Sequence, residues 1–61
     1  MNAYKLKTVF ANYKHVNYFY IPHGGGFLVY IIDEDDFTYE TFLNCREHEI
    51  PQHVVDFIEC N

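Results

Sequence analysis

One uninterrupted run of apolar residues, at positions 27–32, restricts the possible folds of this chain more than any other feature. Pro22 and the glycines at 24–26 break the chain before the run, because proline lacks a backbone donor and glycine readily adopts positive φ. The acidic residues 33–36 end it. The run is apolar on both faces of a strand, which is typical of strands buried on both sides. We therefore expect it in the middle of a sheet, or in a sheet covered by helix on one side and by a partner on the other.

Two further strands are predicted before this run. Residues 4–10 place alternate side chains on two different faces, as a half-buried strand does. Residues 12–15 are compatible with a turn, and residues 16–21 continue in β-branched and aromatic types that favour a pleated surface. Because the connections are short, sequential strands should pair. The first half of the chain therefore predicts a three-stranded antiparallel β-meander.

The spacing of apolar residues changes after the acidic run and predicts two short helices. Thr38 or Asp36 could cap the first, where carboxylates also meet the positive end of the helix dipole. Pro51 suits the first position of the second. The stripe of the first helix would be Tyr39, Phe42, Leu43 and Arg46, and that of the second Ile50, Val54, Phe57 and Ile58.

These elements predict an α+β fold, with the three-stranded antiparallel meander followed by two short α-helices packed on one face. The alternative makes the last segment, residues 52–59, a fourth strand. With 61 residues the chain has room for a single small domain, residues 1–61, which buries only about 60% of the surface that its unfolded chain exposes. Its stability should be marginal. A content of 49% hydrophobic residues is nevertheless too high for a disordered chain.

The charged residues are divided between the two halves of the chain. Residues 1–30 carry +3 from three lysines, and residues 31–61 carry −8 from one arginine and nine carboxylates, which gives the net charge of −5. The first half also holds eight of the twelve aromatic residues. An aromatic surface with lysines, joined to a strongly acidic one, is typical of proteins that bind other macromolecules.

Two groups of residues suggest specific chemistry, and neither predicts an enzyme. Residues 23–26 match the oxyanion loop of lipases and esterases, but the sequence contains no serine to act as nucleophile. Cys45, His48, His53 and Cys60 are zinc-type ligands, at spacings unlike those of small zinc modules. A Cys45–Cys60 disulfide is conceivable, but two cysteines are too few for a secreted disulfide framework, which favours a reduced, cytoplasmic setting. We expect no catalysis, no cofactor and no metal.

Composition also limits the class of partner. The longest apolar run has six residues, against the roughly 20 needed to cross a bilayer, so no membrane span is expected. Lysines interleaved with tyrosines can stack on single-stranded nucleic acid, but a net charge of −5 opposes any approach to phosphate. A protein partner is therefore favoured over direct binding to nucleic acid.

We expect a small acidic intracellular protein-binding module, an inhibitor of the kind that phages and mobile elements encode against host proteins. Its carboxylates would contact a basic host surface, in the manner of a phosphate backbone presented to a nucleic-acid-binding enzyme. The alternative is a homodimeric structural or regulatory subunit that associates through its aromatic sheet face. The predicted partner-binding residues are Asp33, Glu34, Asp35, Asp36, Glu40, Tyr18, Tyr20 and Tyr30.

Overall fold

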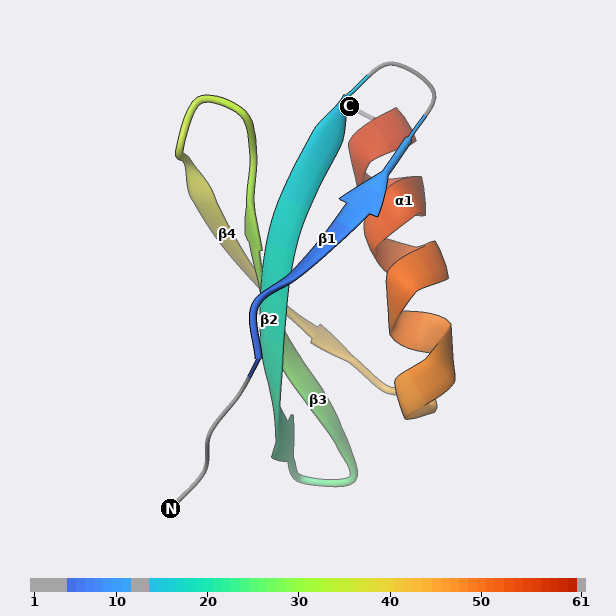
Figure 1. Ribbon diagram of the computed structural model, residues 1–61. Helices are drawn as coiled ribbons and strands as arrows, with labels where there is room; N and C mark the ends of the chain where they lie inside the picture. Colours follow the sequence, from blue (N-terminus) through green and yellow to red (C-terminus); the bar gives the residue numbers. More distant parts are fainter. Residues whose placement is uncertain (1–4, 12–13, 61) are drawn as a thin grey trace.

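The chain forms one twisted antiparallel sheet with a helix across one of its faces (Figure 1). The computed structural model describes residues 5–11 and 14–60. The four strands follow the order of the sequence across the sheet, each paired with the next. The elements are β1 (Lys7–Phe10), β2 (His15–His23), β3 (Gly26–Ile32), β4 (Thr38–Leu43), the short 3-10 helix η1 (Glu47–Glu49) and the helix α1 (Ile50–Cys60).

The predicted three-stranded meander is present as β1, β2 and β3, and the apolar run is an inner strand of the sheet, as expected. Residue 4 of the first predicted strand and residues 12–13 of the predicted turn lie outside the described residues. A tight two-residue turn joins β2 to β3. Gly24 and Gly25 both have positive φ, 52° and 87°. Positive φ at both central residues matches the twist of the flanking strands, and glycine adopts it without steric cost. Gly24 and Gly25 therefore form the turn of the β2–β3 hairpin.

The predicted fold with two helices is wrong, because residues 38–43 form the strand β4 and not a helix. These residues are rich in threonine and aromatic side chains, which favour strands. Their pairing with β3 places Tyr39, Thr41 and Leu43 on one sheet face. The β3 residues that share this face are Phe27, Val29 and Ile31. A segment with apolar side chains on both faces satisfies the helix spacing and the strand alternation equally. The fold is α+β, with four strands and one C-terminal helix.

The acidic residues between β3 and β4 form a turn, so the predicted helix caps at Thr38 and Asp36 are also wrong. Oδ1 of Asp33 accepts hydrogen bonds from the backbone N–H groups of Asp35, at 2.8 Å, and Phe37, at 3.0 Å. Asp36 has a positive φ of 66°, which aspartate tolerates better than most residues. The side chain of Asp33 thus organises the reversal that returns the chain to the sheet.

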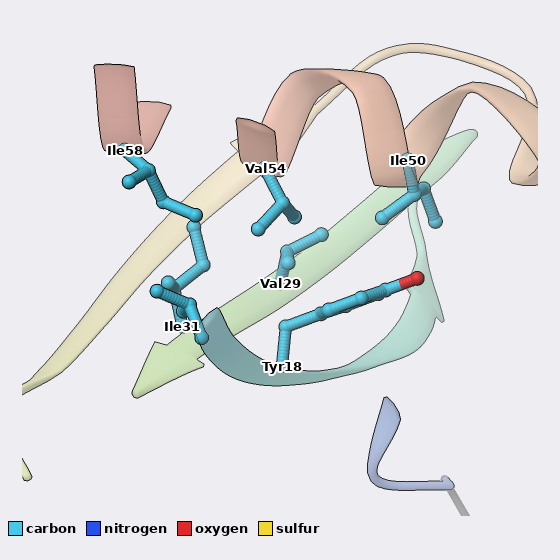
Figure 2. Packing of buried hydrophobic residues seen from close by; sticks show 7 residues of the cluster. Tyr18, Val29, Ile31, Ile50, Val54 and Ile58 are labelled. Carbon is cyan, nitrogen blue, oxygen red and sulfur yellow. The ribbon is translucent and has the colours of Figure 1, made fainter. Parts of the chain in front are cut away.

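The helix predicted at the C-terminus is confirmed, and its alternative as a fourth strand is wrong. Three predicted stripe residues, Ile50, Val54 and Ile58, are buried, whereas Phe57 is only half-buried and lies against the ring of Tyr39, with 5.2 Å between centroids. Figure 2 shows the three buried helix residues above Tyr18, Val29 and Ile31 of the sheet. The buried core consists of Val16, Tyr18, Val29, Ile31, Ile50, Val54 and Ile58.

Candidate protein-binding surface

The predicted partner-binding residues do not form one continuous surface. Tyr18 is 3% exposed and belongs to the core under α1. Tyr20 lies on the same sheet face as Tyr18, whereas Tyr30 lies on the opposite face, beside Glu40 of β4. Residues 33–36 form the β3–β4 turn at one end of the sheet. The fold therefore brings Tyr30 and Glu40 together on one sheet face, and stacks the rings of Tyr18 and Tyr20, with centroids 6.2 Å apart, on the other.

Tyr18 has almost no surface to offer a partner. Its ring lies beneath Ile50 of α1 (Figure 2), and burial raises the pKa of its hydroxyl above the usual value. Tyr18, Phe19 and Tyr20 are consecutive aromatic residues, so alternation along β2 must send them to both faces. Alternation alone does not determine which of the two faces the helix covers.

Tyr20 connects the sheet to the segment that enters the helix. Its hydroxyl donates a hydrogen bond of 2.5 Å to Oε2 of Glu47 in η1, and Nζ of Lys7 lies 5.7 Å from its ring centroid. The hydrogen bond to Glu47, with burial and the charge of Glu47, raises the pKa of Tyr20 to about 12. The Tyr20 hydroxyl therefore has a structural role in holding η1 against β2.

This contact should make stability depend on alkaline pH. The folded-state pKa of Tyr20 lies above the ordinary value of 10.0, so the contribution is complete below that pH and is lost as the pH rises toward about 12. We expect the unfolding free energy to fall less steeply above pH 10 in Tyr20→Phe than in the wild type. Urea unfolding over this range measures the difference. Equal slopes in the two proteins would show that Tyr20 ionises normally in the folded state.

The sheet face opposite α1 carries large apolar side chains that no described element covers (Figure 1). Phe42 and Phe10 are 46% and 74% exposed, and the remaining side chains are half-buried among their neighbours in the sheet. The rings of Phe19 and Tyr30 stack at 4.9 Å with an interplanar angle of 14°. We call this surface the open face, and its apolar members are Phe10, Phe19, Ile21, Leu28, Tyr30, Ile32 and Phe42.

Among its described strand residues, the open face carries one carboxylate, Glu40, and no lysine or arginine, while His15 and His23 lie at the two ends of β2. The hydroxyl of Tyr30 donates a hydrogen bond of 3.3 Å to Oε2 of Glu40. The described lysine of β1, Lys7, projects from the opposite, helix-bearing face. More carboxylates follow in the exposed turn at residues 34–36, next to β4 in the chain. The open face thus has an uncharged centre on β2 and β3 and an acidic border along β4.

The candidate zinc ligands are not gathered into a metal site. Within residues 5–11 and 14–60, no group of three or more histidine, cysteine or acidic side chains is placed to hold a metal ion. Cys45 and Cys60 are free thiols, so the conceivable disulfide is not formed. Burial and the nearby charge of Glu49 both raise the pKa of the Cys45 thiol. A raised pKa lowers the thiolate fraction and opposes nucleophilic chemistry.

Comparison of the chain with protein families, with characterised proteins and with solved structures yields no match. Within the part of the chain that the structure describes, no helix has the length and apolar character needed to cross a membrane. The functional proposal therefore depends on the residues themselves.

Sequence reasoning missed most of the open face. The helix spacing predicts Phe42 in the stripe of a helix, whereas β4 places it on the open face, two residues from Glu40. Ile21 and Leu28 pair across β2 and β3 and point the same way. The signal that could have found them is the period of two within each apolar segment, once residues 38–43 are assigned to a strand.

Proposed function

We propose that this protein is a non-catalytic binding module that covers a basic surface of a larger protein with its open face. The exposed apolar side of the sheet carries the proposal. Soluble monomers rarely leave a large continuous apolar surface uncovered, and such patches usually mark sites of protein association. Aromatic side chains suit this role because they supply large contact areas at low cost in conformational entropy.

The acidic border along β4 supports a basic partner. Glu40 lies on the open face itself, and residues 34–36 lie in the turn that precedes β4. Charges at the rim of an interface mainly accelerate encounter and select the partner, while the apolar centre provides most of the binding energy. A protein that covers a basic groove in this way would act as an inhibitor by occlusion, including of a nucleic-acid-binding enzyme.

Binding to the captured partner should depend strongly on Phe42 and weakly on Phe37. Phe42→Ala removes an exposed ring from the open face, whereas Phe37→Ala makes the same change at a ring that is 63% exposed in the β3–β4 turn. We expect a loss of affinity of roughly tenfold or more for Phe42→Ala, as for an aromatic side chain that anchors an interface. Pull-down followed by titration measures both variants. Equal effects of the two substitutions would contradict the assignment of the interface.

Higher ionic strength should slow the association of this protein with its partner. Raising the ionic strength from about 0.05 M to about 0.5 M shortens the Debye length from roughly 14 Å to roughly 4 Å, which weakens attraction between exposed charges. Glu34→Gln and Asp35→Asn should reduce this salt dependence, because each removes an exposed charge. Asp33 is unsuitable for such a test, since its carboxylate holds the turn.

A homodimeric subunit is the second candidate, and the uncharged centre of the open face favours it. Two sheets can pack face to face about 10 Å apart, as in β-sandwiches. Sedimentation equilibrium over a wide range of concentrations separates the two functions. A mass of two chains that Phe42→Ala returns to one would support the homodimer.

A further inference from the structure

We propose that Glu40, between the rings of Tyr30 and Phe42, binds an arginine side chain of the partner protein. This inference rests on the proposed function and names the chemistry that its partner must present. Tyr30 lies opposite Glu40 in the register of β3 and β4, and Phe42 lies two residues further along β4 on the same face. Residues two apart on a strand are about 7 Å apart, so the carboxylate has an aromatic ring on two sides.

Other aromatic rings support both neighbours of the carboxylate. The ring of Phe19 stacks on Tyr30, and the ring of His23 meets Phe42 edge-on, with 6.3 Å between centroids and an interplanar angle of 79°. The hydroxyl of Tyr30 donates to Oε2 of Glu40. The rings and the carboxylate are therefore already arranged before a ligand arrives, which lowers the entropy that binding must overcome.

The position of Glu40 determines the charge of whatever covers it. A partner that packs on the open face removes water from this carboxylate, and a buried charge without a counter-ion is strongly unfavourable. The described strand residues that share this face with Glu40 include no lysine or arginine, and Tyr30 donates a hydrogen bond to its carboxylate. The covering surface must therefore supply the cation.

The aromatic surroundings favour arginine over lysine. A guanidinium group is planar, stacks on aromatic rings and pairs with a carboxylate through two parallel hydrogen bonds. An ammonium group is a compact, strongly hydrated charge that gains less from flat apolar neighbours. The same reasoning disfavours a second copy as the occupant, because the described strand residues of its open face include no lysine or arginine.

NMR titration of the isotope-labelled protein with N-acetyl-arginine amide tests this site, with N-acetyl-lysine amide as the matched cation. We expect shift changes centred on Tyr30, Glu40 and Phe42, and an affinity for the arginine probe at least threefold above that for lysine. Glu40→Gln should lower the affinity for the arginine probe at least fivefold. Glu59→Gln makes the same change at an exposed residue of α1 and should alter the affinity for the arginine probe by less than twofold.

Three results would overturn the arginine site. They are equal binding of the two cations, equal losses of affinity in Glu40→Gln and Glu59→Gln, and a dimer at neutral pH that buries Glu40. If the arginine probe fails while Phe42→Ala still weakens capture of the partner, the arginine site is wrong and the proposed function stands. If Phe42→Ala has no effect on capture while the probe binds at Glu40, the proposed function is wrong.

Discussion

Ile50→Ala should lower the unfolding free energy by about 2 to 5 kcal/mol, which is the range for removing a large aliphatic side chain from a packed core. Ile50 is fully buried at the start of α1 and packs over the sheet (Figure 2). A single core of this size rarely supplies more than about 3 to 5 kcal/mol in total. The variant should therefore be largely unfolded near body temperature, as measured by thermal circular dichroism.

Two neighbouring valines provide the matched control for this expectation. Val54 is fully buried and Val55 is half-buried, so the same substitution to alanine creates a cavity only at Val54. Each methylene-sized group lost from the core costs about 0.8 kcal/mol before the cavity is counted. Phe57→Ala should fall between the two, since its ring remains partly in solvent. Equal thermal midpoints for Val54→Ala and Val55→Ala would show that α1 does not pack as described.

Gly26→Ala should be the second most damaging change, by about 1 to 3 kcal/mol, because it inserts an atom where no space exists. A Cβ at Gly26 would lie 2.5 Å from the backbone oxygen of Leu43 and 2.7 Å from Cζ of Phe42. The Phe42 ring can rotate away, but the carbonyl belongs to the strand β4 and can move only if the pairing of β3 with β4 opens. Urea unfolding measures the loss.

Gly24→Ala separates this clash from the general effect of removing a glycine. A Cβ at Gly24 meets no atom within 4 Å, but the residue has a φ of 52°. Gly24→Ala should lower the unfolding free energy by only about 1 to 2 kcal/mol, which is the cost of a left-handed backbone conformation for a residue with a Cβ. Gly26→Ala should in addition shift the aromatic NMR signals of Phe42, and Gly24→Ala should not. Unchanged Phe42 signals in Gly26→Ala would contradict the close approach of the two strands.

The parts of the fold that were predicted correctly from sequence are those whose pattern of apolar residues fits one kind of element better than the other. Residues 27–32 are apolar at every position and lie between strong chain breakers, and the helix residues Ile50, Val54 and Ile58 recur at every fourth position. Residues 38–43 have apolar side chains at both periods, so pattern alone could not choose. The choice is made by the turn that Asp33 organises, which returns the chain alongside β3.

The candidate surface was predictable only in part, for the same reason. The sequence located the carboxylates near β4, since they are contiguous in the chain. It could not tell that Tyr18 faces the helix and Tyr30 faces away, because this depends on which sheet face α1 covers. Pairing of β3 with β4 then places Glu40 opposite Tyr30, a proximity that arises from register and not from spacing.

Cross-saturation NMR on the labelled protein, bound to its captured unlabelled partner, tests whether the open face is the binding surface. It reports which protons of this chain lie against the partner, whatever the partner is. We expect saturation at the open face, on Ile21, Leu28, Ile32 and Phe42, and little on the exposed residues Gln52 and Asp56 of α1. Saturation confined to α1 and η1, with the open face unaffected, would contradict the claim that the uncovered side of the sheet is the binding surface.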